Sequence, residues 1–394
     1  MAASLKQRIS PAWRGVIVFL ITFAAAGIYN PFVNLALDAR GLTESQIGLF
    51  NAVPGAITII SGPILCRIAD KRRQRLLFAT IGALMYAFFS ALLSIPWGFA
   101  WLIGVQVVMA AVTPPISPIR DAIAARMTTK YGLSFARWRM WGSLGFAVTS
   151  LVMGVVWQLI GIEWLFLGTS LVFLVSAAIV NLLEEPEADT DIIQTDEKWY
   201  QWLPKEGTVW LFLLAATLAH MAMQPFYHFS AIHMVRLGGT EGMAGMMRAA
   251  SAFVEVFTMW WAGKLIKRFG PIKVFLVGAV VFAISWLGFA LATQGWMLIA
   301  ITAFRGVGFG FTAVAAVVYL DSKAKSSEAA SYQGLMSALV FGVGPLIAGP
   351  IGGRLAELYG LSWLFGLSSM IGWLSVGVCL VIVWNQRRKN VRNS

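Results

Sequence analysis

The stretch CRIADKRRQR (66–75) carries five basic residues between two long apolar segments, and GKLIKRFGPIK (263–273) carries four between two others. When the stretches are aligned from their first residues, charged side chains recur at matching places and Arg73 falls opposite Gly270. Each stretch follows the second apolar segment of its own half of the chain. The sequence therefore predicts an internal repeat of two related halves.

Apolar segments of membrane-spanning length follow one another along the chain. Hydrophobic residues make up 58% of the 394 residues and charged residues 12%, with a mean hydropathy of +0.74, whereas soluble domains average about 25% charged residues. Because a helix needs about 20 apolar residues to cross a bilayer, we expect an all-α membrane protein. The twelve expected spans lie near 15–37, 46–67, 76–95, 98–121, 136–158, 162–183, 208–232, 243–265, 272–292, 296–319, 329–352 and 361–384.

The longest polar interruption, 184–207, separates six expected spans from the other six and contains the acidic run EEPEADTD. We therefore expect an N-terminal six-helix bundle over 1–183, an acidic cytoplasmic linker over 184–207 and a C-terminal six-helix bundle over 208–394. In membrane proteins built from such repeated halves, the binding site lies near the bilayer midplane.

Basic residues gather on one side of the membrane in this arrangement. Since cytoplasmic loops carry an excess of Lys and Arg, we expect a multi-pass protein of the cytoplasmic membrane with both termini in the cytoplasm. The net charge of +12 then reflects topology, and no nucleic-acid partner is expected. Only five of the 30 lysines and arginines lie elsewhere, namely Arg40, Arg236, Arg248, Arg305 and Arg354.

Motifs for bound cofactors are missing from the sequence. Cys66 and Cys379 have no metal-ligand or disulfide spacing, and no Gly-x-x-x-x-Gly-Lys-Ser/Thr run is present. The run GVGFG (306–310) is a poor dinucleotide motif because no strand precedes it. We expect no cofactor, no metal, no enzymatic activity and a monomeric state.

The repeated loop resembles the loop motif of the major facilitator superfamily, Gly-x-x-x-Asp-Arg/Lys-x-Gly-x-basic-basic. The first copy departs from it at Cys66 and Arg73, and the second has Lys267 where the acid belongs. The resemblance implies a conformational latch on the cytoplasmic side, although a basic loop that only sets topology remains the alternative. The latch residues would be Asp70, Lys71, Arg75, Arg268 and Lys273.

A narrower resemblance lies in FARWRMWGSLGF (135–146), which is similar to the start of the fifth span in the branch containing lactose permease, nucleoside:proton symporters and phenylpropionate permeases. It implies that Arg139 binds substrate, that Asp121 is its acidic partner, and that Phe146 stacks on the substrate. A lone charge within a membrane helix costs about 2.5–3.5 kcal/mol, so charges are kept where they pair or face water. We expect Asp121 and Arg139 to pair, with an ion pair at the membrane rim as the alternative.

Two charges lie deep in the C-terminal half. Glu255 is about 18 Å into its span and Arg305 about 14 Å into its own, counted from the same side, so the two side chains are expected to meet. The resemblance implies that an acid at Glu255 contacts substrate and takes part in proton coupling, with Arg305 beside it. The proton-carrying acid of lactose permease is replaced here by Gly308. Glu255 is therefore the candidate proton carrier, and a fixed structural salt bridge is the alternative.

Further polar residues recur at helical spacing within the spans and are expected to turn toward a cavity. They are His220, Gln224 and Tyr227 in the span 208–232, and Asn30 and Asn34 in the span 15–37.

The resemblance implies a secondary transporter that works by alternating access, as a proton symporter for a small polar solute. Candidate solutes are an oligosaccharide, a nucleoside or an aromatic carboxylate, and the expected partners are this solute, protons and membrane lipid. Two rival hypotheses stay open, a proton-coupled exporter and a non-transporting membrane sensor on the same fold.

Overall fold

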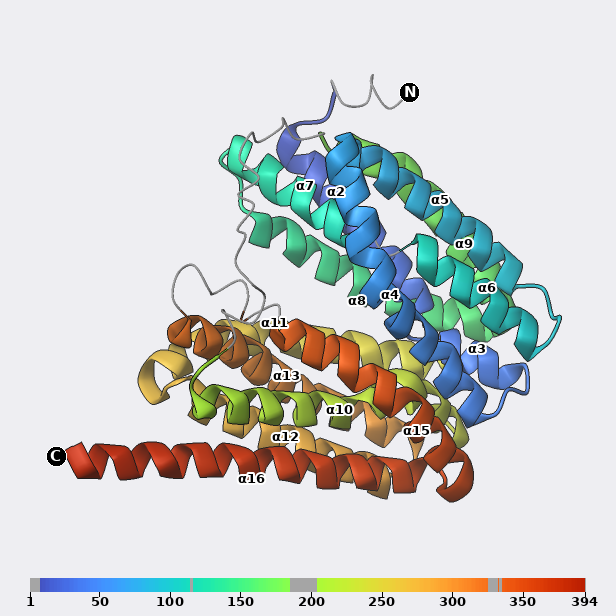
Figure 1. The fold of residues 1–394 in the computed structure, drawn as a ribbon. Helices are drawn as coiled ribbons and strands as arrows, with labels where there is room; N and C mark the ends of the chain where they lie inside the picture. Colours follow the sequence, from blue (N-terminus) through green and yellow to red (C-terminus); the bar gives the residue numbers. More distant parts are fainter. Residues whose placement is uncertain (1–7, 114–115, 185–203, 325–331, 333–334, 394) are drawn as a thin grey trace. The chain divides into compact units, whose positions relative to one another are not determined.

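The computed structural model describes residues 8–113, 116–184, 204–324, 332 and 335–393, and it describes their side chains except at 70, 136, 341–345, 387 and 389–393. Within these residues the chain is helical and contains no strand (Figure 1). Most of the expected linker 184–207 lies outside the described residues, so the expected domain boundary stays a prediction.

Contacts divide the chain into two compact units. The first comprises Met1–Leu42, Leu49–Ile193 and Ala244–Ala249, and the second comprises Thr43–Gly48, Gln194–Met243 and Ala250–Ser394. The helices of the N-terminal half are α2 (Pro11–Tyr29), α3 (Val33–Ala39), α4 (Glu44–Arg72), α5 (Arg75–Leu93), α6 (Phe99–Val112), α7 (Ile116–Lys130), α8 (Phe135–Ile160), η1 (Ile162–Trp164), α9 (Leu165–Ile179) and η2 (Val180–Leu182). Those of the C-terminal half are α10 (Gly207–Arg236), α11 (Glu241–Phe269), α12 (Pro271–Leu291), α13 (Gly295–Lys323), the π-helix η3 (Ala338–Val343), α15 (Gly344–Tyr359) and α16 (Leu361–Asn393).

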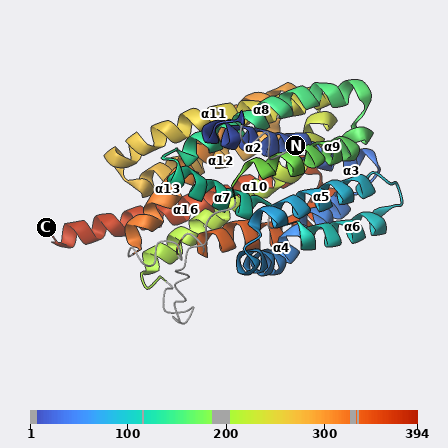
Figure 2. The same ribbon diagram turned by 90° about the horizontal axis from the view of Figure 1, so that it is seen from above.

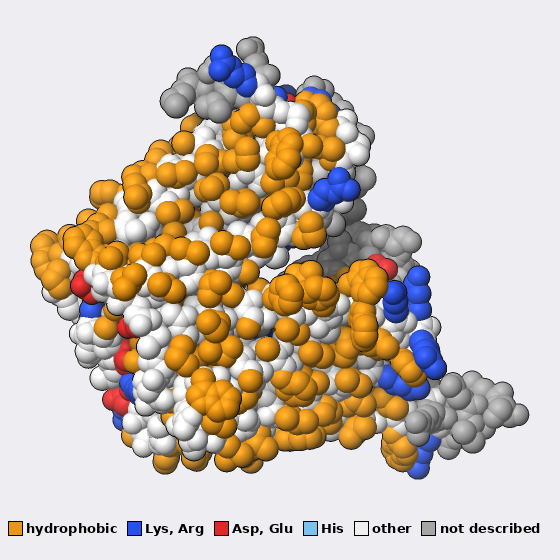
Figure 3. Space-filling view, turned by 180° about the vertical axis from the view of Figure 1, so that it is seen from behind, with side chains coloured by type: hydrophobic (Ala, Val, Ile, Leu, Met, Phe, Trp, Pro, Cys, Tyr) orange, Lys and Arg blue, Asp and Glu red, His pale blue; other side chains and the backbone are white. Residues whose placement is uncertain are grey.

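Ten helices in the described part of the chain are long and apolar enough to cross a membrane. The expected spans 243–265 and 329–352 are not among them: α11 carries charges in its middle, and α15 has only 16 residues. Large apolar side chains are exposed on the helices, and Figure 3 shows hydrophobic side chains spread over one face of the molecule. Water would disfavour so much exposed apolar surface, so this is a multi-pass membrane protein.

Two expected spans have different limits in the structure. The span 15–37 is divided by a turn at 30–32, because Pro31 lacks an N–H donor and its ring disfavours a continuous helix. The span 98–121 is divided after Val112, and its second part, α7, continues to Lys130. Asp121 therefore lies nine residues before the end of α7, whereas we expected it at the end of its span.

Close packing of α8 against α2 depends on the glycines of the motif in α8. A Cβ atom on Gly145 would lie 2.5 Å from the Leu20 carbonyl oxygen, and one on Gly142 would lie 2.7 Å from the Phe23 ring. The two helices pack side by side over their length (Figures 1 and 2). Small residues allow membrane helices to approach in this way, and here they set Phe23 against the first turns of α8.

The two repeated loops share one backbone feature. Arg73 has φ +54° and Gly270 has φ +83°, so the two aligned positions both adopt the left-handed conformation. Glycine adopts this conformation freely, whereas a residue with a Cβ is disfavoured there by roughly 1–2 kcal/mol. The alignment of the two halves is therefore matched by the geometry of their loops.

Replacing Arg73 by glycine is expected to raise the unfolding temperature of the purified protein, because it removes the cost of a left-handed arginine. The gain should be below about 1 kcal/mol, since glycine also adds entropy to the unfolded chain. Arg73→Ala is the matched control, which removes the same charge but keeps a Cβ and should bring no gain. Equal unfolding temperatures for the glycine and alanine variants would contradict the explanation.

Glu184 joins three segments at one end of the first unit. It lies 2.7 Å from Arg14 and 3.5 Å from Lys130, and it accepts hydrogen bonds of 3.0 and 2.8 Å from the Tyr131 hydroxyl. Burial acts to raise the pKa of Glu184, but the hydrogen bond from Tyr131 and the charges of Lys130 and Arg14 outweigh it, so this pKa lies below its ordinary value. The carboxylate is therefore more stable charged in the folded protein than in the unfolded chain.

Glu184→Gln is expected to lower stability at pH 7 by about 1 kcal/mol, the upper end for exposed ion pairs. A carboxylate with a lowered folded pKa stabilises the protein above its unfolded pKa of about 4.3, and it loses this contribution as the pH falls through the folded value. The difference in unfolding temperature between parent and variant should therefore shrink below about pH 4.3. A difference that stays constant down to pH 3 would contradict the prediction.

Candidate functional site

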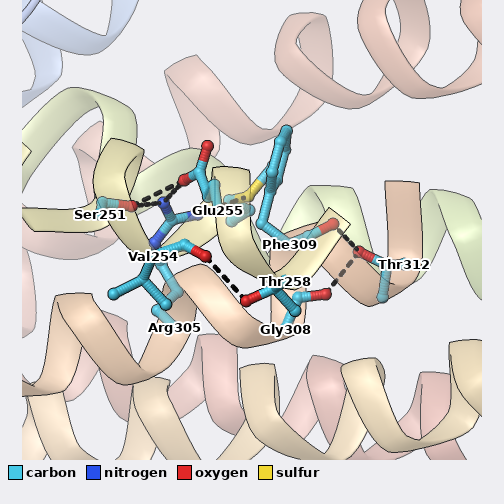
Figure 4. A network of polar contacts seen from close by, with 9 residues as sticks. Ser251, Val254, Glu255, Thr258, Arg305, Gly308, Phe309 and Thr312 are labelled. Carbon is cyan, nitrogen blue, oxygen red and sulfur yellow. Dashed lines mark hydrogen bonds and ion pairs between the residues drawn. The ribbon is translucent and has the colours of Figure 1, made fainter. Parts of the chain in front are cut away.

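The C-terminal unit contains a buried ion pair between α11 and α13. Arg305 Nη2 lies 2.6 Å from Glu255 Oε1, and the Ser251 hydroxyl donates to the same oxygen at 2.7 Å (Figure 4). The same nitrogen of Arg305 also donates to the Ser251 oxygen. Arg305 is 3% exposed and Glu255 21% exposed. The two charges that we expected to meet are thus brought together.

Apolar and aromatic side chains surround the guanidinium. Its carbon lies 4.4 Å from the ring centre of Phe226 and 5.8 Å from that of Phe309, and Nη1 donates to the sulfur of Met223 at 3.5 Å. Aromatic faces attract cations, especially where water is excluded. The Nε atom of Arg305 has no hydrogen-bond partner among the described residues. Aromatic faces, and not only oxygen atoms, therefore stabilise the positive charge of the Arg305 guanidinium.

Glycines on α13 explain why the pair can form. A Cβ on Gly306 would lie 3.0 Å from the Ser251 carbonyl oxygen, and one on Gly310 would lie 2.7 Å from Thr258 Cβ. The nearby threonines return their hydroxyls to their own helices, Thr258 to Val254 and Thr312 to Gly308 (Figure 4). The run RGVGFG thus acts through close helix packing, which lets Arg305 reach across to Glu255.

The N-terminal unit corrects one expected contact. Asp121 pairs with its neighbour Arg120, whose Nη2 and Nε lie 2.8 and 2.9 Å from Asp121 Oδ1, and it does not pair with Arg139. Asp121 lies about 14 Å from the end of α7, whereas Arg139 lies about 6 Å from the start of α8. The two residues therefore sit at different heights on their helices, and the buried Arg120 is closer.

Arg139 takes a different partner from the one expected. It is exposed, its guanidinium carbon lies 4.1 Å from the ring centre of Phe23, and Nη1 donates to the Ser143 hydroxyl at 3.5 Å. Arg120 contacts the same Phe23 ring at 4.9 Å and donates to Thr22 Oγ1 at 3.1 Å. Two arginines thus contact one aromatic side chain, and Asp121 pairs with one of them.

The remaining expected cavity residues lie in different surroundings. Phe146 and His220 are half-buried, and His220 Nδ1 lies 3.1 Å from the Ala216 carbonyl oxygen of its own helix. Gln224 is buried whereas Tyr227 is exposed, so these two do not share one environment. The other two are separated by the turn at Pro31: Asn30 is exposed, and the buried Asn34 accepts a hydrogen bond of 2.8 Å from Asn51.

Residues of the expected latch lie at the ends of α4 and α11 and at the starts of α5 and α12. Lys71, Arg268 and Lys273 are exposed and Arg75 is half-buried, and Arg268 lies 5.2 Å from the Phe269 ring centre. The side chain of Asp70 lies outside the described residues. The role of these residues as a latch stays a prediction.

Sequence reasoning missed Arg120, Ser251 and Phe226 as members of these clusters. Arg120 had a visible signal, because an arginine within a membrane helix is rare and is kept where it has a partner or a function. Placing the end of that helix at 121 hid the signal. Ser251 and Phe226 had none, since serine and phenylalanine are common in membrane helices and only contact with Arg305 distinguishes them.

Comparison with known proteins agrees with this architecture. The model of the family described as "MFS_1 like family" matches residues 12–367. A maltose permease of Geobacillus stearothermophilus is 25% identical over 94% of this chain and 93% of its own, and a probable 3-phenylpropionic acid transporter of Escherichia coli (strain K12) is 25% identical over 88% and 92%. The crystal structure of a mutant of the nucleoside transporter NupG superposes with a TM-score of 0.83 at 14% identity, covering 95% of this chain and 100% of the other.

Proposed function

We propose a proton-coupled mechanism for this chain, which belongs to the MFS_1 like family of the major facilitator superfamily of transporters. The resemblance seen in the sequence and the predicted all-α major facilitator fold are both confirmed. In our proposal the protein carries a small polar solute across the cytoplasmic membrane together with protons, by alternating access. Both termini would lie in the cytoplasm, where 25 of the 30 basic residues would gather.

The observation that carries the proposal is the ion pair of Glu255 and Arg305. Membrane helices keep such charges where they pair or serve an ion or substrate pathway. Glu255 is the more exposed member of the pair and holds the only carboxylate in contact with Arg305 among the described residues. A proton bound by Glu255 would release Arg305 to a substrate oxygen, which would couple the two binding events.

Charged and aromatic residues are the proposed substrate ligands. In this proposal Arg139, Asp121 and Phe146 act in the N-terminal unit, joined by Arg120 and Phe23, which contact Asp121 and Arg139. The similar proteins are named for maltose and for 3-phenylpropionic acid, and the superposed one for nucleosides. We therefore keep an oligosaccharide, a nucleoside and an aromatic carboxylate as candidate substrate classes.

Purified protein in liposomes with a pH-sensitive dye outside tests the mechanism. Maltose, uridine and 3-phenylpropionate would be added in turn, with protein-free liposomes as the control. Alkalinisation outside on addition of one solute is the result expected for symport. Acidification would instead favour an exporter that exchanges solute for protons, and no flux with any solute would favour a sensor.

A further inference from the structure

A pocket lies inside the N-terminal unit, between α2, α5, α7 and α9. It has a volume of about 130 Å³, and apolar side chains that include Phe23, Ala83 and Phe173 form much of its lining. Its polar lining residues are Thr22, Ser117, Arg120 and Ser176. The alanines leave the space, and the two phenylalanines provide aromatic walls. An apolar cavity of about 150 Å³ is large enough to bind benzene, so this pocket is close to the size of one aromatic ring.

Ser176 offers an unused hydroxyl to this pocket. It is 3% exposed, and its Oγ has no hydrogen-bond partner among the described residues. By contrast, the buried Ser90 Oγ of the same unit donates to the Phe166 carbonyl oxygen at 2.9 Å. A buried polar group without a partner is unfavourable, so an oxygen atom of a ligand in the pocket would stabilise Ser176 by accepting a hydrogen bond from its hydroxyl.

Arg120 provides charge and further donors at the same pocket. It is 4% exposed, and its described bonds use three N–H groups, two toward Asp121 and one toward Thr22. A guanidinium has five N–H donors, which leaves two for a ligand. Because Arg120 is buried, an oxygen atom of the ligand that accepts from these N–H groups is the complementary group.

The charges around Phe23 do not cancel. Arg120 and Arg139 both lie over its ring, at 4.9 and 4.1 Å, and Asp121 is the single carboxylate that pairs with either of them among the described residues. The cluster therefore carries one net positive charge. A ligand with one negative charge would complete it, and arginine binds carboxylates well because its planar fork matches two oxygens.

We infer that this pocket is the subsite for a compact aromatic monocarboxylate, whose ring lies between Phe23 and Phe173 and whose carboxylate accepts from Arg120 and Ser176. This inference rests on the proposed transport function and narrows its substrate class. A disaccharide is disfavoured because it would fill more than this volume and place many hydroxyls against alanine and phenylalanine. The pocket lies wholly within the first unit.

Isothermal titration of the full-length protein in detergent with benzoate, benzamide and maltose tests the inference. Benzoate should bind, whereas benzamide, which has the same ring without the charge, should bind at least tenfold more weakly, and maltose should not displace benzoate. Equal affinity for benzoate and benzamide, or no benzoate binding, would overturn the inference.

Two serine variants provide matched controls. Ser176→Ala should weaken benzoate binding about tenfold, the size expected for one hydrogen bond to a charged group, without lowering the unfolding temperature, since its hydroxyl has no protein partner. Ser90→Ala should lower the unfolding temperature and leave benzoate binding unchanged. The reverse pattern would mean that Ser176 has only a structural role, which overturns the inference.

Ala83→Leu fills the pocket and should abolish benzoate binding. If this variant fails to fold, the Ser176 result decides the question alone. Liposome flux separates the two proposals: proton-coupled maltose uptake without benzoate binding would overturn the aromatic subsite and leave the transport function standing. Benzoate binding without flux of any solute would overturn the transport function instead.

Discussion

Glu255→Gln is expected to abolish uphill accumulation of substrate while exchange of substrate across the membrane continues. Glutamine keeps the oxygen that accepts from Ser251 and Arg305, so the local fold should persist. The ring faces of Phe226 and Phe309 should continue to stabilise the guanidinium. Glutamine cannot gain or lose a proton, however, so no proton gradient can drive accumulation. Exchange needs no net proton movement and should proceed at close to the parental rate.

Counterflow and gradient-driven uptake in liposomes measure these two activities separately. Glu206→Gln is the control, because it changes an exposed carboxylate that pairs with Lys323 at the end of α13 and should keep both activities. If Glu255→Gln still concentrates substrate against a gradient, Glu255 is not the proton carrier. Coupling would then reside with Asp121, His220 or another ion.

Arg305→Met is expected to destabilise the protein by about 3–5 kcal/mol, the cost typical of leaving one member of a buried ion pair without its partner. The arginine is 3% exposed, and no other cation among the described residues pairs with Glu255. Adding Glu255→Gln in the same chain should recover most of this loss, because the remaining side chain is then neutral. The unfolding free energies of the parent, both single variants and the double variant measure the coupling.

The exposed pair Lys323 and Glu206 is the matched control, since its ion-pair distance of 2.7 Å is similar. The same cycle with Lys323→Met and Glu206→Gln should show a coupling of about 0–1 kcal/mol, as usual for exposed pairs. Equal coupling energies for the two pairs would contradict the role of burial. A double variant as unstable as Arg305→Met alone would show that Arg305 acts mainly through Phe226 and Met223.

The pair in the C-terminal unit could be predicted from the sequence because both partners are single charges deep in apolar spans. Depth along a helix follows from counting residues, and Glu255 and Arg305 lie at similar depths. The predicted contact between Asp121 and Arg139 in the N-terminal unit was wrong, because α7 ends at Lys130 and not at 121. An error of nine residues moves a side chain by about 14 Å along a helix, which is enough to change its partner.

The break of the first span was not predicted from the sequence. Pro31 divides the first span and thereby separates Asn30 from Asn34, although a helix period counted across the proline places them on one face. The alignment of the two repeated loops agrees with the structure, because the left-handed conformations of Arg73 and Gly270 occur at the positions that the alignment paired. The loop alignment therefore predicted matching backbone positions correctly, whereas helical periodicity did not predict which residues share a helix face.

The sequence by itself determined the membrane class, the two related halves and the pairing of Glu255 with Arg305, because the cost of placing charge in an apolar span is visible in composition alone. Only the tertiary structure decided that Arg120 pairs with Asp121, that two arginines share Phe23, and that Ser176 faces a pocket with its hydroxyl unused. These contacts depend on the rotation and relative height of neighbouring helices. Close packing at glycines such as Gly142 and Gly306 sets this rotation and this height, which the pattern of apolar residues does not specify.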